Sequence, residues 1–294
     1  MISTLSRAFY ASLLLCLSAF PARSHAASRE NLFEVTSGLG RKLYALPDTD
    51  GSIAAARKSL AADPKNVDLV LKLSKAQAAK RQYREAVATC TAGLQSAPNN
   101  ADLFLERGHR ELGLREFKQA LADLQRAVEI NPKMLDAQYH LGMAHYFLRE
   151  FPQAAERFQR ALDLANSNDS IIDCSNWVYV SLCRAGQTAA AASVLSRITP
   201  AMKNQEPHLY FYLRLLRFYQ GVISENDVLP RKPADPTDTE SELSFNTVSY
   251  GVGNRHLYTN TNPVRAHELF QNVVTGNAWN SWGFIGSELE LSRK

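Results

Sequence analysis

The residues that could perform chemistry are scattered along the chain and match no catalytic spacing. Serine, histidine and aspartate occur throughout, but Gly-x-Ser-x-Gly, His-Glu-x-x-His and a glycine-rich phosphate loop are all missing from the sequence. Gly251-Val252-Gly253 lacks the third glycine of a dinucleotide-binding loop, and no strand is predicted before it. We therefore expect no enzymatic activity and no cofactor.

Metal binding is not indicated by the spacing of the histidines and acidic residues. His140 and His145 are five residues apart, which places them on different sides of a predicted helix. Asp163, Asp169 and Asp173 do not have the spacing of a calcium-binding loop. We expect ordinary core or surface residues at these positions and no metal site.

The cysteines do not form a disulfide framework. Cys90, Cys174 and Cys183 remain if residues 1–26 are removed, and an odd number leaves at least one thiol unpaired. Cys174 and Cys183 are nine residues apart on one predicted helix, or about 13 Å along its axis, which is too far for a disulfide. Cys90 is expected to be a small buried apolar residue.

The elements that must position these residues repeat every 34 residues between residues 67 and 166. Aromatic residues, small residues and prolines recur at this interval, in the sets Tyr83, Phe117 and Phe151; Ala86, Ala120 and Ala154; Gly93, Ala127 and Ala161; Ser74, Gly108 and Gly142; and Pro64, Pro98 and Pro132. Each unit holds two amphipathic helices. Small residues are expected where the paired helices approach closely, so that Gly108 faces Ala120 and Gly142 faces Ala154. Pro132 is expected to end the second helix of its unit.

The 34-residue period and the recurring small residues and prolines resemble the tetratricopeptide repeat (TPR), a helix–turn–helix unit that stacks into a solenoid. The resemblance implies an all-α protein, a TPR α-solenoid of stacked helix–turn–helix repeats with a C-terminal helical extension. The expected divisions are a signal peptide at 1–26, a degenerate N-terminal cap repeat at 27–66, three TPR repeats at 67–166, a degenerate fourth repeat and an apolar helix at 167–229, an acidic proline-rich loop at 230–242, and a fifth TPR-like repeat with a capping helix at 243–294. Helices are predicted at Glu30 to Leu46 in the cap repeat and at Leu243 to Tyr258 after the loop.

The N-terminus has the pattern of a secretory signal peptide. Arg7 precedes the apolar run Ala8 to Phe20, and Ser24-His25-Ala26 offers small residues for cleavage after about Ala26. The run is too short for a permanent membrane helix, so we expect no integral membrane segment in the mature chain. Lipid attachment at Cys16 is not favoured because the bulky Leu15 precedes it. The mature protein is expected to be exported, either periplasmic or secreted.

The charge balance does not favour nucleic acid as a partner. The formal net charge is +4 at pH 7, with 33 basic and 29 acidic residues, and no predicted helix carries a basic stripe. The expected partner is therefore a protein or a peptide.

The C-terminal half suggests a narrower resemblance. Trp177-Val178-Tyr179, the stretch Phe218 to Glu225, Ala266 through Phe270 and Glu288 through Leu291 resemble bacterial envelope TPR proteins of the lipoprotein NlpI type. Members of that group are non-enzymatic adaptors that hold peptidoglycan hydrolases or an envelope protease, often as dimers. The resemblance thus implies an interaction adaptor or scaffold of the bacterial envelope, and a homodimer as one arrangement.

The surface for a partner is expected to be the concave groove, which the first helix of each TPR unit lines. The groove residues are predicted to be Leu71, Lys75, Asp102, Leu105, His109, Asp136, Tyr139, Met143 and Tyr146. Tyr139, Met143 and Tyr146 form one stripe at i, i+4 and i+7. This stripe either contacts a peptide or packs against neighbouring helices of the same chain, and helical spacing does not distinguish the two. The groove set contains the acidic residues Asp102 and Asp136 and one lysine, Lys75. An apolar or basic peptide is therefore expected to bind there.

A different function is a structural or assembly subunit of an envelope complex. The apolar helix Tyr210 to Tyr219 and the capping helix Trp279 to Leu291 would then form an obligate oligomer interface.

Overall fold

The computed structural model describes residues 32–204, 210–235 and 238–293. The described part is helical apart from one short antiparallel hairpin, so the predicted all-α solenoid is confirmed. The signal-peptide prediction falls on residues outside the described part. Within the described residues, no helix is both long enough and apolar enough to cross a bilayer.

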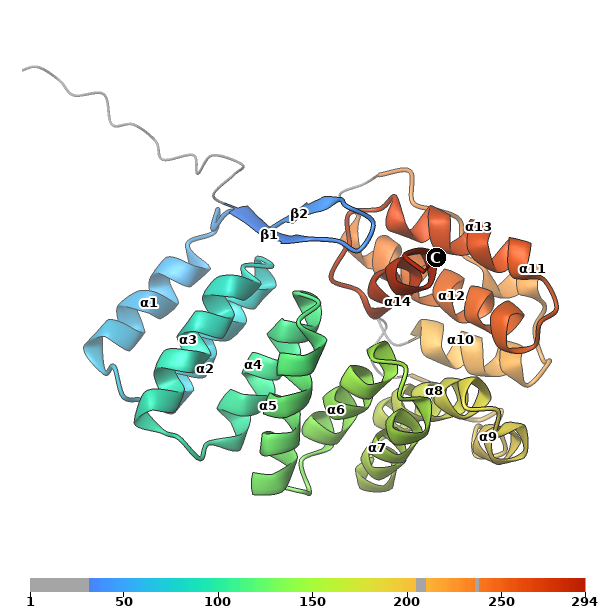
Figure 1. Ribbon diagram of the computed structural model, residues 1–294, viewed down its shortest axis with the longest axis horizontal. Helices are drawn as coiled ribbons and strands as arrows, with labels where there is room; N and C mark the ends of the chain where they lie inside the picture. The colour runs from blue at the N-terminus through green and yellow to red at the C-terminus, as the bar shows by residue number, and fades with distance from the viewer. Residues whose placement is uncertain (1–31, 205–209, 236–237, 294) are drawn as a thin grey trace, which may run out of the picture.

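The helices follow one another in antiparallel pairs, which Figure 1 shows as an arc from α1 to α9. The C-terminal helices return toward the beginning of the arc, and the hairpin spans the remaining distance. The elements are β1 (Phe33–Thr36), β2 (Lys42–Tyr44), α1 (Ser52–Ala62), α2 (Val67–Ala79), α3 (Tyr83–Ser96), α4 (Ala101–Gly113), α5 (Phe117–Ile130), α6 (Leu135–Phe147), α7 (Phe151–Leu164), α8 (Asn168–Arg184), α9 (Thr188–Leu195), α10 (Tyr210–Tyr219), α11 (Glu225–Val228), α12 (Thr239–Tyr258), α13 (Pro263–Val274) and α14 (Trp282–Leu291).

Small residues let the two helices of a repeat approach closely. A Cβ on Gly108 would lie 2.7 Å from Leu124 Cγ and 3.2 Å from the Ala120 carbonyl oxygen, which confirms the predicted contact with Ala120. A Cβ on Gly142 would lie 2.8 Å from the nearest atom of the Phe158 ring, and Phe158 occupies the same repeat position as Leu124. The repeat-defining alanines are completely buried at Ala120, Ala127, Ala154 and Ala161.

The turn between the two helices of each regular repeat contains an arginine in the left-handed conformation. Arg81, Arg115 and Arg149 have φ values of 57°, 66° and 65°, at the 34-residue interval. A non-glycine residue is uncommon in this region of backbone space. Each of these arginines reaches a C-terminal residue: Arg81 donates to the Asn277 carbonyl at 2.8 Å, Arg115 pairs with Glu288 at 2.8 Å, and Arg149 lies 3.6 Å from Glu290. We call Arg81, Arg115 and Arg149 the arginine row.

The predicted helix from Glu30 to Leu46 is wrong, because residues 33–44 form the hairpin β1–β2. Gly40, at φ 80°, lies in the connecting turn, and Phe33 pairs with Tyr44 across the strands. Leu43 is buried against C-terminal residues, including Trp279. The strands are therefore held by tertiary packing that the local sequence does not reveal.

The hairpin joins the first repeats to the C-terminal helices. Its Gly38 N–H donates to Glu288 Oε1 at 2.7 Å, and Arg41 Nη1 donates to the Gly276 carbonyl at 2.7 Å. On the other side, Arg84 N–H donates to Glu34 Oε2 at 2.9 Å. The hairpin thus contacts both ends of the solenoid.

The helix predicted to start at Leu243 begins earlier, at Thr239. Asp238 accepts a hydrogen bond from the Ser241 N–H at 3.0 Å and caps α12, so the last residues of the predicted loop 230–242 are helical. The following helix α13 has Pro263 in its first turn, where a proline is well tolerated.

Most of the apolar residues considered for an oligomer interface pack inside the chain, although Tyr210 at the start of α10 is 56% exposed. On α10, Leu213, Leu215 and Leu216 are at most 3% exposed, and on α14 Phe284 and Ile285 are at most 1% exposed. The apolar faces of these two helices pack into the core of the same chain. The described residues therefore do not support a homodimer interface formed by α10 and α14.

Candidate partner-binding site

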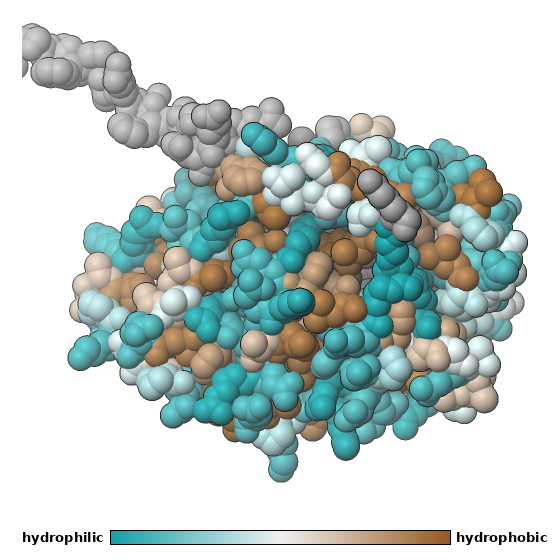
Figure 2. All heavy atoms as spheres, in the orientation of Figure 1, coloured by the Kyte–Doolittle hydropathy of each residue, from teal (hydrophilic) through white to brown (hydrophobic). Residues whose placement is uncertain are grey.

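The predicted groove is open at its N-terminal end and covered further along. Lys75, Asp102 and Asp136 are exposed, and Leu71 and Leu105 are partly exposed. Tyr139, Met143 and Tyr146 are buried, at 7%, 0% and 3% exposure. The change occurs at α6, where the C-terminal helices return across the concave side. Figure 2 shows apolar side chains gathered in the middle of this face, between the repeats and the C-terminal helices.

The second half of the predicted tyrosine stripe is a contact between two parts of the chain. Tyr146 Oη lies 2.8 Å from Tyr250 Oη on α12, and Asn254 Nδ2 donates to Tyr146 Oη at 2.7 Å. Arg184 extends this buried network by donating to Asn254 Oδ1 at 2.7 Å. Tyr146 therefore packs against the chain's own helices, which is one of the two roles that the spacing left open.

Tyr139, the first member of the stripe, has a different position. It lines a pocket of about 310 Å³ at the place where α4, α6 and α8 meet α10, α12 and the start of α14. We call this the concave pocket, and its lining includes His109, Tyr139, Asp173, Phe211, Tyr212 and Trp282. Glu240 also lines it, from the first turn of α12.

Asp173 places a carboxyl group in the lining of the concave pocket, at a position that follows the 34-residue period. Leu71, Leu105, Tyr139 and Asp173 occupy the same position in successive first helices. Tyr139 Oη donates to Asp173 Oδ1 at 3.1 Å, so two equivalent positions of neighbouring repeats contact each other. Extending the predicted groove line by one more period would have found Asp173. The ring residues Phe211 and Trp282 lie outside the repeats and carry no such signal.

The carboxyl group of Asp173 is electrostatically unbalanced. Burial raises its pKa to about 7, the hydrogen bond from Tyr139 opposes this increase, and the negative charge of Asp136 adds to it. Among the described residues, no lysine, arginine or histidine forms an ion pair with Asp173. A positive charge from outside the chain would relieve this imbalance.

The two histidines beside the pocket do not provide that charge. The rings of His109 and His140 lie 4.0 Å apart between centroids, and Trp282 lies 5.5 Å from His109. Burial lowers the pKa of both histidines, so both are neutral at pH 7. His140 donates from Nδ1 to the Asp136 carbonyl at 2.7 Å, whereas His145 is on another side of α6 and contacts Glu150.

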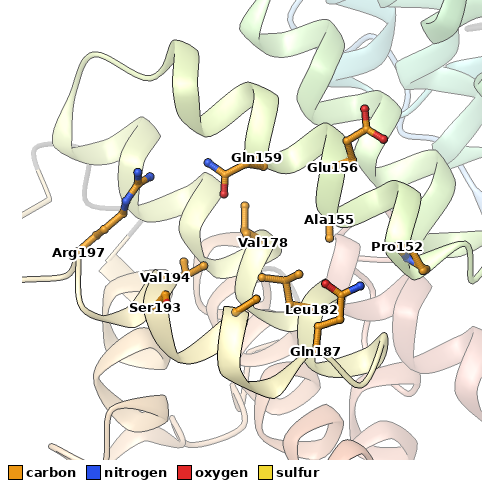
Figure 3. Close-up of a pocket in the computed structure, with 11 residues that line it drawn as sticks. Pro152, Ala155, Glu156, Gln159, Val178, Leu182, Gln187, Ser193, Val194 and Arg197 are labelled. Carbon is orange, nitrogen blue, oxygen red and sulfur yellow. The ribbon is translucent and has the colours of Figure 1, made fainter.

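A larger hollow of about 530 Å³ lies between α7, α8 and α9 (Figure 3). Its floor is formed by Val178 and Leu182, and Gln159 and Arg197 project around it. The hollow lies along the second helices, away from the concave side. No buried charged group points into it, and nothing in the structure indicates what would cover it. The concave pocket is therefore the better candidate for a specific site.

The described residues contain no cluster of three or more histidine, cysteine, aspartate or glutamate side chains suited to a metal ion. Cys90, Cys174 and Cys183 are free and buried. The concave pocket places a hydrogen-bonded carboxyl group, that of Asp173, among aromatic rings, so its geometry suits the binding of a ligand.

Comparisons with known proteins agree with the repeat architecture. The model of the tetratricopeptide repeat matches residues 38–101 and 105–169, so the chain contains TPR repeats. A comparison with curated protein sequences finds no match.

Solved structures of TPR-type proteins resemble this chain. A tetratricopeptide repeat protein from Parabacteroides merdae ATCC 43184 is 16% identical over 83% of this chain and 92% of that chain, with a TM-score of 0.48. MamA is 25% identical over 51% of this chain and 86% of that chain, with a TM-score of 0.46. YrrB, described as a TPR protein with an unusual peptide-binding site, is 16% identical over 63% of this chain and 91% of that chain, with a TM-score of 0.36. The narrower resemblance to the NlpI type is not shown by these similarities.

Proposed function

We propose that this protein is a non-enzymatic interaction scaffold of the bacterial envelope that holds a partner protein through an extended segment in its concave groove. TPR repeats are generally interaction modules without catalytic activity, which supports the assignment as an interaction scaffold. The observation that supports binding in the groove is the exposure of Lys75 and Asp102 along α2 and α4, together with the concave pocket beyond them. The envelope location rests on the signal-peptide pattern of residues 1–26.

The open part of the groove is directed toward the concave pocket, because Leu71, Leu105 and the pocket residue Tyr139 occupy the same position in successive first helices. Leu71 and Leu105 offer partly exposed apolar surface, while Asp102 and Asp136 are exposed carboxylates beside them. An apolar segment with basic residues would complement this surface. The hydrophobic contacts would provide most of the affinity, and the acidic residues would select the charge of the partner.

A site-specific photo-crosslinker tests this function. The crosslinking residue replaces Leu105 on the concave side in one variant and the exposed Lys118 of α5 in a matched control. The full-length protein is expressed with its leader in a bacterial host and the envelope fraction is irradiated. We expect discrete adducts from position 105 and none from position 118, and mature protein whose N-terminal residue is Ala27. Equal adducts from both positions, or none from position 105, would contradict the groove as the binding surface.

A further inference from the structure

The concave pocket combines aromatic rings with a carboxyl group, which are the features of a cation-binding site. Tyr139, Tyr212, Phe211 and Trp282 surround it with aromatic rings from three different parts of the chain, and Asp173 supplies a carboxyl group. The negative face of an aromatic ring attracts a cation, and the attraction increases when the cation is removed from water. A carboxyl group among aromatic rings therefore favours a positively charged group with an apolar stem.

The arginines that lie over aromatic rings in the described part of the chain lie over other rings. Elsewhere, Arg184 lies over the Phe151 ring at 4.6 Å and Arg115 lies over the Trp279 ring at 5.6 Å. Among the described residues, no arginine or lysine lies over Tyr139, Tyr212, Phe211 or Trp282. The pocket thus combines an unbalanced carboxyl group with rings that no internal cation occupies.

The hydrogen bond from Tyr139 favours lysine over arginine as the cation. It occupies Asp173 Oδ1, which leaves the second carboxylate oxygen for the ligand. Arginine binds a carboxylate best through two parallel hydrogen bonds, whereas the lysine ammonium is a compact charge that needs one oxygen. The volume of about 310 Å³ is at the lower end of the range for small-ligand pockets, which is roughly 300–1,000 Å³, and suits one long side chain.

We propose that the concave pocket binds the protonated side chain of a lysine that is presented by an extended partner segment. This proposal rests on the interaction function proposed above and names the residue that the groove selects. The segment lies along α2 and α4, past Leu71 and Leu105, and its lysine enters between the rings to meet Asp173. Glu240 and Asp136 add negative charge around the entrance.

Isothermal titration of the mature protein with three matched peptides tests the proposal. Each peptide is short, blocked at both ends and rich in leucine, with a single lysine, arginine or Nε-acetyl-lysine at its centre. We expect the lysine peptide to bind at least about tenfold more tightly than the acetyl-lysine peptide, because acetylation removes the charge and keeps the stem. The arginine peptide is expected to bind between the two. Equal affinity for the lysine and acetyl-lysine peptides, or no binding of the lysine peptide, overturns the proposal.

Substitutions locate the effect in the pocket. Asp173→Asn removes the charge and keeps an acceptor for Tyr139, so it should weaken the lysine peptide about tenfold and leave the acetyl-lysine peptide unchanged. The control Asp163→Asn removes an exposed carboxylate from α7 and should change neither affinity. Trp282→Leu changes a lining residue on a different helix and should also reduce the preference for lysine. Agreement between the two variants would show that the effect does not come from misfolding of one of them. An unchanged preference in Asp173→Asn contradicts the assignment.

The failure of this proposal can be distinguished from failure of the scaffold function. If position 105 still crosslinks while the peptides show no preference for lysine, the groove binds a partner by other contacts. If the crosslinks are also absent, the scaffold function itself is contradicted. Equal affinity for a blocked single lysine and for the lysine peptide would identify a small-molecule site and overturn the peptide assignment.

Discussion

Glu111 is a buried acidic residue whose carboxyl group is not fully hydrogen-bonded within the second repeat. It occupies the position of Gln77 in the preceding repeat, where Thr89 Oγ1 donates to the Gln77 amide oxygen at 2.8 Å. In the second repeat Asp123 replaces Thr89, and Arg107 pairs with Asp123 rather than with Glu111. Glu111 Oε2 has no hydrogen-bond partner among the described residues. Burial raises the pKa of Glu111 to about 8, and the charge of Asp123 raises it further.

Glu111→Gln should therefore stabilise the protein above neutral pH. The folded protein holds a proton on Glu111 that the unfolded chain loses near pH 4.5, so its contribution to stability decreases as the pH rises from about 4.5 to about 8. The amide cannot ionise, and we expect a gain on the order of 2 kcal/mol at pH 8 that disappears near pH 4.5. Urea unfolding at both pH values measures it. Glu129→Gln, at an exposed site on α5, should change stability little at either pH, and a loss of stability in Glu111→Gln at pH 8 would refute the argument.

Asp173 makes the proposed lysine binding depend on pH. Its pKa of about 7 means that the carboxyl group is mostly protonated at pH 6 and mostly ionised at pH 8. The groups that face it are Tyr139 and Asp136 from α6, Cys174 from α8, Tyr212 from α10, Glu240 from α12 and His109 from α4. Burial raises the pKa of the tyrosines and Cys174 and lowers that of His109, so these four stay neutral between pH 6 and pH 8.

The affinity for the lysine peptide should thus increase about tenfold from pH 6 to pH 8, following the ionised fraction of Asp173. Titration calorimetry at the two pH values measures the change, and Asp173→Asn is the control in which the dependence should vanish. Affinity that is flat or decreases over this range in the unmodified protein would exclude Asp173 as the group that meets the ligand.

At the scale of elements, the packing of α14 on α12 depends on the absence of a side chain at Gly283. A Cβ there would lie 2.2 Å from the Asn246 carbonyl oxygen and 2.5 Å from its carbonyl carbon. These are backbone atoms, so the helices would have to separate. We expect Gly283→Ala to destabilise the protein by about 2 kcal/mol or more, despite the higher helix propensity of alanine. Thermal unfolding measures the effect beside Gln271→Ala, an exposed position on α13. A more stable Gly283→Ala variant would show that the two helices are not held this close.

The sequence predicted the repeat elements because their determinants are local and periodic. The close contact at Gly108 and the buried alanines follow from the 34-residue interval. The hairpin and the coverage of the groove could not be predicted in this way. Leu43 and Tyr146 are buried by residues more than one hundred positions away in the chain, such as Trp279 and Tyr250. The arginine row was visible in the sequence, but its partners Asn277, Glu288 and Glu290 have no periodicity.

At the scale of the whole molecule, the solenoid is closed by its own two ends. A stack of repeats normally exposes apolar surface at its termini and needs capping units there. Here the hairpin and the C-terminal helices share one core with the first repeats, formed by Leu43, Tyr83, Leu114, Phe245, Trp279 and Phe284 among others. This closure covers the groove from α6 onward and leaves the concave pocket at the edge of the covered part. Closure and the shape of the site are therefore linked.

Glu288 on α14 contacts both the hairpin and the arginine row, so it connects the two ends of the solenoid. Its side chain is 1% exposed, and it accepts hydrogen bonds from Arg115 Nη2 at 2.8 Å and from the Gly38 N–H at 2.7 Å. Glu288→Gln would keep the size of the side chain but leave the mostly buried Arg115 without its counter-ion, which costs roughly 3 kcal/mol. Because the hairpin is tied to the same carboxylate, the loss should appear there first.

We expect Glu288→Gln to speed amide hydrogen exchange of residues 33–44 well before α5 and α7 are affected, since the repeats keep their own contacts. Hydrogen-exchange mass spectrometry combined with urea unfolding measures both effects. Glu268→Gln removes a carboxylate from an exposed pair with Arg265 and should leave the hairpin protected. Uniform acceleration across all repeats in Glu288→Gln would mean that the closure and the solenoid unfold as one unit, whereas unchanged exchange in the hairpin would show that Glu288 does not hold the two ends together.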